Sequence, residues 1–362
     1  MRILFVKLGA IGDIIHTLPA LARVRDSMPE ATIGWVAESR SAEILRGNPM
    51  IDELVEVDTR AMRSGSVLED MLPEVRRQIG GLRRIEYDIA LDFQGLLKSA
   101  AIAKLSGAKI RWGFSRKALR EPASRVLLTH TIDIEPNSHV IEKNIRLAEA
   151  ALNIPGHSGP PEFPIFTAAE HRIEAKEIAD RAVGSYALLN PAGGWVTKLW
   201  PTETYGALAE MIHDRTGITP IIVTGPRETE LASRAVEASS GKAIAATPTL
   251  KGFYELARNA AFYVGGDTGP THLAIAAGAP VVGIFGPTEW WRNGSPHPDD
   301  ICVERTDITC RTDCHRRTCG NWICMDINPA DVYSAVTQRL SLVSIQRTSR
   351  DISTASKDVR LS

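Results

Sequence analysis

The stretch that decides the fold opens the chain: RILFV at residues 2–6, then KLGAIGD at 7–13 and IIHTLPALARVRDS at 14–27. A short apolar run is followed by two glycines, and apolar side chains then recur at close to helical spacing. This order predicts a buried strand, a Gly-rich turn and an amphipathic helix over 13–27. In open α/β sheets, ligands bind at the carboxyl ends of strands, so the turn is the first candidate site.

The same alternation continues along the chain. Near-continuous apolar strands separated by helices favour parallel sheets covered by helices on both faces. Further strands are expected at 32–37, 53–57, 88–92, 109–113, 186–189, 219–224, 242–246, 261–265 and 280–285. Further helices are expected at 67–84, 96–106, 138–152, 167–183, 202–215, 227–238, 250–259, 270–277 and 329–343.

The chain is too long for one ordinary hydrophobic core. It has 362 residues, and single cores stop growing at about 250–300 residues. The segment NIPGHSGPPEFP at 153–164 holds four prolines and two glycines, which marks a boundary. We therefore expect one α/β domain at 1–155, a second at 165–345, the two facing each other across a cleft, and a flexible tail at 346–362.

Composition narrows the class of protein. Hydrophobic residues make up 44% of the chain and charged residues 23%, as in ordinary globular proteins. The net charge of −1 gives no sign of a nucleic-acid partner, and none is predicted. No apolar run approaches the roughly 20 residues of a membrane helix. The opening run is too short for a signal peptide, so a cytoplasmic protein is expected.

Asp13 stands where the first turn meets its helix. Two interpretations of this carboxylate are open: it caps the helix, or it faces a molecule that Gly9 and Gly12 allow to approach the backbone. A nicotinamide oxidoreductase is disfavoured, because the G-x-x-G spacing does not match the G-x-G-x-x-G of a dinucleotide site.

The second candidate site is GGDTGPTH at 265–272. This turn opens a helix with Pro270 in its first turn, and the N–H groups at such an end bind phosphate readily. Asp267 would repel phosphate, so we expect it to orient main-chain N–H groups or a sugar hydroxyl. The alternative is an ordinary strand–turn–helix connection.

Two more turns follow strands in the second half. In NPAGGWVTKLWP at 190–201, Thr197 and Lys198 suit phosphate oxygens, the lysine as a compact charge. In TGPRE at 224–228, the Glu228 carboxylate suits a ribose diol. Because these turns should end at one edge of a sheet, together they predict a pocket for a nucleoside diphosphate.

The motifs of the two halves together resemble those of a known family. The chain is similar to glycosyltransferase family 9, the ADP-heptose:lipopolysaccharide heptosyltransferases. The most specific stretches are VKLGAIGDIIHTLPAL at 6–21 and GGDTGPTHLAIAAGAPVVGIFGPT at 265–288. YDIALDFQGLLKSA at 87–100 and ALREPAS at 118–124 look like the heptosyltransferase I branch.

The resemblance implies a fold and a reaction. The fold is the GT-B arrangement of two Rossmann-like domains, with the nucleotide-sugar bound in the C-terminal one and the acceptor in the N-terminal one. The reaction is an inverting, metal-independent transfer of heptose from ADP-heptose to the Kdo inner core of lipopolysaccharide, with no cofactor required for catalysis. Nothing in the chain resembles the D-x-D metal site of other glycosyltransferases.

The resemblance also assigns roles to single residues. Asp13 resembles the catalytic base, and Glu228 resembles the ribose ligand. Lys98 and Arg120 resemble basic residues on the acceptor side. The residues that resemble the donor-diphosphate site are Lys198, Asp267, Thr268, Gly269 and His272.

A basic window supports an anionic acceptor. Residues 60–125 hold 14 Lys and Arg against seven Asp and Glu. Kdo carries a carboxylate and lipid A carries phosphates, so a basic face would steer this acceptor and rest on the inner face of the inner membrane. Arg60 and Arg63 therefore join Lys98 and Arg120 as candidate acceptor contacts. The alternative is that about half of these basic residues are solvated helix faces.

The cysteines form the one departure from heptosyltransferase I. The spacing C-x3-C-x4-C-x4-C places Cys310, Cys314, Cys319 and Cys324 within fifteen residues. Disulfides are rare in the cytosol, so a structural zinc or iron site is predicted, with a local disulfide or free thiols as alternatives. Other branches of the family have a Cys-rich segment, and some protein-heptosylating relatives hold iron in a cysteine cluster.

Two other functions stay open. One is a family 9 transferase that acts on a protein or on a later core acceptor. The other is a nucleotide-sugar-binding module without catalysis, against which the Asp13 carboxylate argues.

Overall fold

The structure is a computed structural model that describes residues 1–58, 80–156, 158–312 and 314–358, with the backbone alone for 344–358. The chain divides into two compact units, Met1–Phe166 and Thr167–Ser362. The division lies just after the proline-rich segment.

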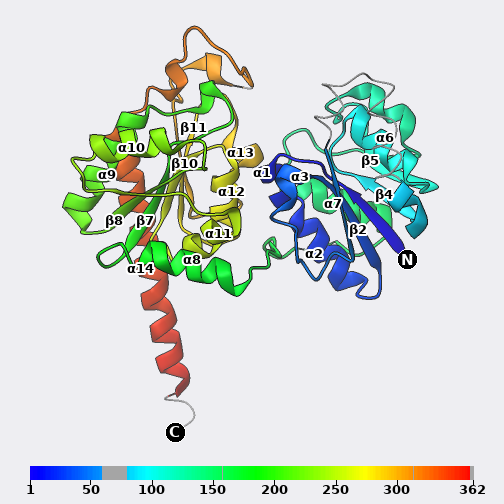
Figure 1. Cartoon of the computed structure of the whole chain (residues 1–362), viewed down its shortest axis with the longest axis horizontal. Helices are drawn as coiled ribbons and strands as arrows, with labels where there is room; N and C mark the ends of the chain where they lie inside the picture. The colour runs from blue at the N-terminus through cyan, green and yellow to red at the C-terminus, as the bar shows by residue number, and fades with distance from the viewer. Residues whose placement is uncertain (59–79, 157, 313, 359–362) are drawn as a thin grey trace. The chain divides into compact units, whose positions relative to one another are not determined.

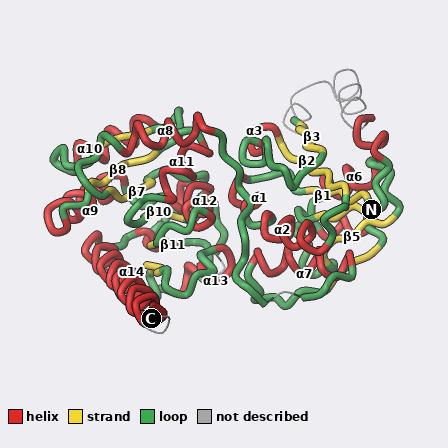
Figure 2. The backbone as a smooth tube through the Cα atoms, turned by 90° about the horizontal axis from the view of Figure 1, so that it is seen from below, coloured by secondary structure: helices red, strands yellow, loops and turns green. Residues whose placement is uncertain are grey.

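The first unit is built on a six-stranded parallel sheet in the order β3-β2-β1-β4-β5-β6. Helices lie on both of its faces (Figures 1 and 2). The strands are β1 (Arg2–Val6), β2 (Thr32–Glu38), β3 (Glu53–Val57), β4 (Ile89–Asp92), β5 (Ile110–Phe114) and β6 (His130–Ile132). The helices are α1 (Ile11–Ile15), α2 (Leu18–Ser27), α3 (Ser39–Ala42), α6 (Leu97–Leu105), η1 (Pro122–Leu127) and α7 (Val140–Leu152), and the described residues 80–85 are also helical.

The second unit repeats the plan with a six-stranded parallel sheet in the order β12-β11-β10-β7-β8-β9. The strands are β7 (Tyr186–Asn190), β8 (Thr219–Val223), β9 (Ile244–Ala246), β10 (Tyr263–Gly266), β11 (Val281–Phe285) and β12 (Ile301–Glu304). The helices are α8 (Ala169–Ala179), η2 (Val196–Lys198), α9 (Thr202–Thr216), α10 (Thr229–Ala238), α11 (Leu250–Arg258), α12 (Gly269–Ala276), α13 (Trp290–Asn293), η3 (Thr309–Arg311), η4 (Ile323–Met325) and α14 (Pro329–Asp358).

These two sheets confirm the predicted α/β class with two Rossmann-like halves. The buried cores explain why the strands read as apolar runs. Leu4 and Val6 of β1 are fully buried with Val36 of β2. Leu189 of β7 and Val264 of β10 are fully buried in the second unit. Strands covered on both faces have no solvent side, so apolar side chains do not alternate with polar ones.

Each sheet has one point where the strand order reverses. In the first unit it lies between β1 and β4, where Val6 pairs with Asp92. In the second it lies between β7 and β10, where Asn190 pairs with Gly265. Chain segments that leave two neighbouring strands at such a point diverge and leave room for a ligand. The turns singled out by the sequence follow three of these four strands.

The structure differs from the sequence prediction at two edge strands, at the first helix and at the C-terminal helix. The short edge strands β6 and β12 were not expected, because three or four half-buried residues give too weak a pattern. The helix expected over 13–27 is two helices, α1 and α2, with Pro19 at the start of the second. Helix α14 runs to Asp358 through most of the segment predicted as a tail, which contains no Gly or Pro to end it. Residues 67–79 of the helix predicted at 67–84 lie outside the described residues.

None of the helices in the described part of the chain is long and apolar enough to cross a membrane.

Candidate functional site

The turn between β10 and α12 is the most densely bonded of the predicted sites. Thr268 is the extended residue before the helix, and Pro270 sits in the first turn as the sequence predicted. The Thr271 hydroxyl contacts the Gly266 carbonyl and lies 3.0 Å from the Tyr263 hydroxyl. These bonds fix the turn from inside the sheet. The main-chain N–H groups at the start of α12 lack carbonyl partners within the helix, as at any helix N-terminus.

Lys198 reaches this turn from the neighbouring strand. It ends η2, in the loop after β7, and its Nζ lies 2.5 Å from Asp267 Oδ2. The pair is buried: the exposed fractions of the side chains are 13% for Lys198 and 4% for Asp267. The two residues are 69 positions apart in sequence, and they meet because β7 and β10 are neighbours.

Asp267 holds several groups around one carboxylate. His272 Nε2 lies 3.2 Å from its Oδ1, and Asn293 Nδ2 donates to its Oδ2 at 3.2 Å. Burial alone would raise the pKa of Asp267, but the His272 hydrogen bond and the Lys198 charge outweigh burial and hold this pKa well below its usual range. Asp267 is therefore ionised at neutral pH and orients Lys198.

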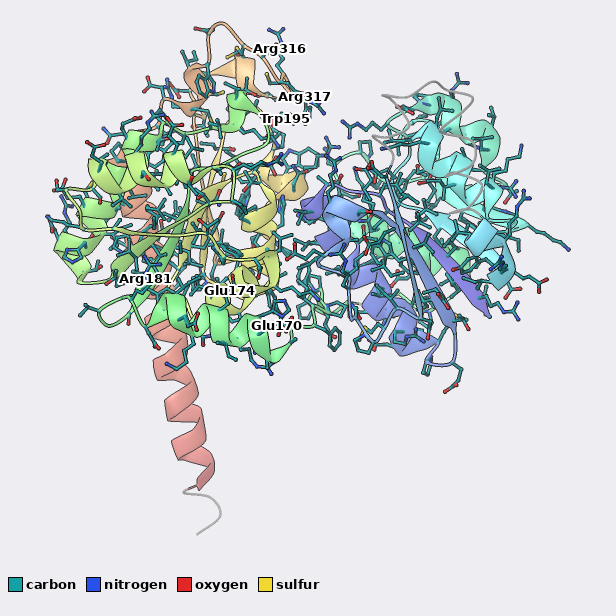
Figure 3. All side chains as sticks on the ribbon, viewed as in Figure 1. Glu170, Glu174, Arg181, Trp195, Arg316 and Arg317 are labelled. Atoms are coloured by element: carbon teal, nitrogen blue, oxygen red, sulfur yellow. The ribbon has the colours of Figure 1, made fainter. Side chains whose placement is uncertain are left out.

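The Lys198 loop also carries an aromatic ring that the sequence analysis missed. Lys198 Nζ lies 4.2 Å from the centre of the Trp195 ring, and Arg317 Cζ lies 4.9 Å from the same centre. Figure 3 shows Trp195 and Arg317 side by side. In the sequence GGWVTK, only Thr197 and Lys198 were assigned to phosphate, and Trp195 was given no role. The ring could not be assigned because Arg317 lies far away in sequence.

Thr197 and Glu228 each hydrogen-bond to the protein main chain. The Thr197 hydroxyl, predicted to hold phosphate, donates to the Arg316 carbonyl at 2.7 Å, so here it binds the cysteine-rich segment. Glu228 precedes α10, and its Oε2 accepts a hydrogen bond from the Gly225 N–H at 3.0 Å. Glu228 is partly exposed at the carboxyl end of β8. The structure thus brings Lys198, Asp267, Thr268, Gly269 and His272 together, and places Glu228 in the turn after a different strand.

In the first unit, Asp13 lies at the turn after β1. Its Oδ2 accepts a hydrogen bond from the Ala10 N–H at 3.1 Å, so the capping interpretation is confirmed. Gly9 adopts φ +151°, and a Cβ there would lie 2.9 Å from Ser41 Oγ, so this position requires glycine. The cap uses one oxygen of Asp13 and does not itself test the other interpretation.

Lys98 belongs to a charge cluster that the sequence analysis did not foresee. Lys98 Nζ lies 2.8 Å from Oε1 of Glu38, the last residue of β2, whose side chain is 6% exposed. Arg40 Nη2 lies 2.6 Å from Oε2 of the same carboxylate. The acidic residue that ends the apolar stretch WVAE could have predicted a carboxylate at this strand end. Two basic side chains are thereby gathered at the carboxyl edge of the first sheet.

The other acceptor candidates are less defined. Arg120 is exposed in the segment between β5 and η1. The next residue, Glu121, donates its N–H to the Gly95 carbonyl after β4. This bond places the Arg120 segment at the same sheet edge as Lys98. Arg60 and Arg63 lie outside the described residues.

The cysteine-rich segment forms a pocket in the second unit. Cys310, Cys314, Cys319 and Cys324 all line a cavity of about 140 Å³, together with Thr197 and Trp322. All the cysteines are unpaired. Across residues 1–58, 80–156, 158–312 and 314–358, no group of three or more His, Cys, Asp or Glu is placed to hold a metal ion. The predicted zinc or iron site therefore finds no support in this arrangement.

Comparison with known proteins adds to this geometry. The family model described as glycosyltransferase family 9 (heptosyltransferase) matches residues 75–321. The chain belongs to glycosyltransferase family 9. The resemblance noted in the sequence is thereby confirmed, and the family 9 chain is a glycosyltransferase.

Individual family members are similar over nearly the whole length. Lipopolysaccharide heptosyltransferase 1 of Pseudomonas aeruginosa is 29% identical over 320 residues, which cover 88% of this chain and 87% of the relative. The structure of E. coli heptosyltransferase WaaC with ADP superposes with a TM-score of 0.76 at 24% identity, covering 94% of this chain and all of that one. WaaC with ADP-2-deoxy-2-fluoro heptose gives a TM-score of 0.71 at 26% identity, covering 84% and 93%.

Proposed function

We propose that this glycosyltransferase moves heptose from ADP-heptose to the Kdo inner core of lipopolysaccharide, with inversion at the anomeric carbon and without a metal ion. Its membership of family 9 and its similarity to lipopolysaccharide heptosyltransferase 1 and to WaaC with ADP support the donor and the pathway. The observation that carries the chemistry is the buried Lys198–Asp267 pair at the start of α12.

The donor diphosphate is the leaving group of this reaction. Its negative charge grows as the bond to the sugar breaks, so groups that stabilise that charge act most strongly in the transition state. Lys198 supplies a cation already oriented by Asp267, and the first N–H groups of α12 supply donors. Glu228 takes the ribose, one strand away from the diphosphate.

These groups take the place of a divalent cation. No two aspartates of the chain stand two residues apart, so the sequence has no D-x-D metal motif. A fixed lysine and a helix N-terminus can neutralise a diphosphate without one. We therefore assign no metal to the transfer step.

Asp13 is the base in this proposal. One of its oxygens caps α1 through the Ala10 N–H, and we assign the other to the acceptor hydroxyl. The cap fixes the carboxylate on the turn after β1, so positioning accounts for much of its effect. The proton of the hydroxyl passes to Asp13 as the hydroxyl oxygen bonds to the anomeric carbon.

The acceptor side is basic. Lys98, held by Glu38, and Arg120 suit the carboxylate of Kdo, with Arg60 and Arg63 as further contacts. A lipid-linked acceptor places the reaction at the inner face of the inner membrane, where this basic window would make peripheral contact.

An acceptor panel tests the proposal. The chain is incubated with ADP-heptose and, in separate reactions, with Kdo-lipid A, with a heptosylated core and with a protein acceptor. We expect transfer to Kdo-lipid A, with inverted configuration in the NMR spectrum of the product. Preferred transfer to the heptosylated core or to protein would replace the proposed acceptor, and retained configuration would exclude the Asp13 mechanism.

A further inference from the structure

The side-chain charges at the donor turn do not by themselves match the charge of a diphosphate. Lys198 is paired with Asp267, which stays ionised, so the two side chains together carry no net charge. A nucleoside diphosphate brings at least two negative charges at neutral pH. The first N–H groups of α12 offset part of those charges, and a further cation close to Lys198 would offset more of them beside the buried Asp267 carboxylate.

Arg317 is placed to supply that charge. Its guanidinium carbon lies 4.9 Å from the centre of the Trp195 ring, and Lys198 Nζ lies 4.2 Å from the same centre. A tryptophan ring attracts cations over its face. The ring therefore gathers two positive groups, one from the loop after β7 and one from the cysteine-rich segment 310–324.

Four bonds fix the segment that carries Arg317. Before it, the buried Arg311 side chain donates from Nε to the Gly286 carbonyl at 3.1 Å, and the His315 N–H donates to the Pro287 carbonyl at 2.9 Å. On either side of it, the Thr197 hydroxyl donates to the Arg316 carbonyl at 2.7 Å and Trp322 Nε1 donates to the Thr197 carbonyl at 3.0 Å.

The last two bonds are made to Thr197, the residue before Lys198. The position of Arg317 is therefore tied to the backbone that carries the donor lysine. The segment reaches the donor loop by specific contacts on both sides of Arg317.

We propose that Arg317 is a second cation of the donor site, which binds the diphosphate beside Lys198 on the Trp195 platform. A guanidinium can hold two phosphate oxygens at once, whereas the Lys198 ammonium acts as a single charge. This role rests on the proposed function, because it assumes an ADP-linked donor. It gives the cysteine-rich segment a purpose in donor binding.

The test compares two neighbouring arginines of the full-length chain. R317A removes the guanidinium next to Trp195. R316A removes the same charge one residue away, from an exposed arginine whose hydrogen bond to Thr197 is made by its main-chain carbonyl and survives the substitution. Binding of ADP, of adenosine and of inorganic pyrophosphate is measured by calorimetry, and thermal melting checks that each variant is folded.

We expect R317A to weaken ADP binding by roughly 10- to 100-fold, the range for one lost charge-assisted phosphate contact. R316A should stay within about twofold of the wild type, and adenosine should bind all three proteins equally. R317K should recover part of the loss, because it restores charge without the planar fork.

Equal ADP affinity of R317A and R316A overturns the role of Arg317 and leaves the proposed function intact. An equal loss for adenosine and ADP also overturns it, because the effect would not be on phosphate. A wild-type chain that binds neither ADP nor pyrophosphate overturns both proposals.

Discussion

Asp13 has a structural role that the structure shows and a chemical role that we propose. Its carboxylate caps α1 through the Ala10 N–H. We predict that D13A lowers the transfer rate by roughly 10²- to 10⁴-fold, the range for a lost general base, and leaves ADP affinity within about twofold. Turnover and ADP binding are measured on the same preparation.

D13N separates the two roles of this residue. Its amide oxygen can still accept the Ala10 N–H, so the cap survives while the base is lost. Transfer by D13N close to that of the wild type would remove Asp13 as the base. Loss of ADP binding in D13A would instead move this residue to the nucleotide.

Lys198 is the cation whose loss should affect both binding and chemistry. We predict that K198A weakens ADP-heptose binding by about 10- to 100-fold, since a charge-assisted hydrogen bond contributes about 1.5–3 kcal/mol. Turnover at saturating donor should fall as well, because the charge of the leaving diphosphate grows in the transition state.

Exposed Lys176 supplies the matched control for K198A. This lysine pairs with Asp180 on the surface of α8, so K176A should leave both quantities unchanged. A normal turnover of K198A at saturating donor would show that Lys198 stabilises the bound donor and its transition state equally.

At the scale of elements, the end of β4 holds a buried carboxyl group. Asp92 is fully buried, and its Oδ1 accepts the N–H groups of Gln94 and Gly95 at 3.0 and 3.2 Å. These bonds shape the turn that leads into α6 and Lys98. Burial raises the pKa of Asp92 to about 6, although the hydrogen bonds and Lys7 oppose it.

The raised pKa sets the sign of a pH effect on stability. In the unfolded chain the Asp92 carboxyl has a pKa near 3.8, whereas in the folded chain its pKa is about 6. The stabilisation from the bound proton is therefore complete below about pH 3.8 and is lost as the pH rises through about 6. The difference of about two units corresponds to roughly 3 kcal/mol.

As the pH rises from about 4 to about 7, we predict that the wild type loses roughly 3 kcal/mol of unfolding free energy that D92N keeps, because the amide side chain of the variant does not titrate. The free energy of unfolding of D92N minus that of the wild type should therefore increase by this amount. Urea unfolding of both proteins at several pH values measures this difference. A difference that does not change with pH would mean that Asp92 titrates normally in the folded chain.

The helices and strands differ in how well they could be predicted from the sequence. Strands buried on both faces, such as β1 and β10, could be predicted because nothing but apolar residues fits there. The Gly-rich turns after them could be assigned to one sheet edge because parallel strands share their direction. The edge strands β6 and β12 could not, because each is short and half-buried and contains polar residues that interrupt its apolar pattern.

The parts of the site that were missed depend on packing between distant segments. Lys198 and Asp267 were each assigned to the donor, but their direct contact follows from the pairing of β7 with β10. The approach of Arg317 to Trp195 depends on how the cysteine-rich segment lies on the Thr197 backbone. No local pattern in the sequence encodes such contacts.

At the scale of the whole molecule, we predict a transfer reaction that needs no added metal. We expect the rate with ADP-heptose and Kdo-lipid A to be unchanged by EDTA, because the proposed transfer relies on Lys198 and the N–H groups of α12, and not on a metal ion, to stabilise the diphosphate charge. The measurement is the initial rate with EDTA, with added magnesium, and with both. Full inhibition by EDTA that magnesium reverses would contradict this mechanism.

The central claim is that this family 9 chain is a heptosyltransferase for the Kdo inner core. The most direct measurement incubates the purified chain with ADP-heptose and Kdo-lipid A and follows ADP release together with the mass of the lipid. We predict that one ADP is released for each acceptor molecule that gains the mass of one heptose. ADP-heptose that binds without any gain in lipid mass, or ADP release without a glycosylated lipid, would contradict it.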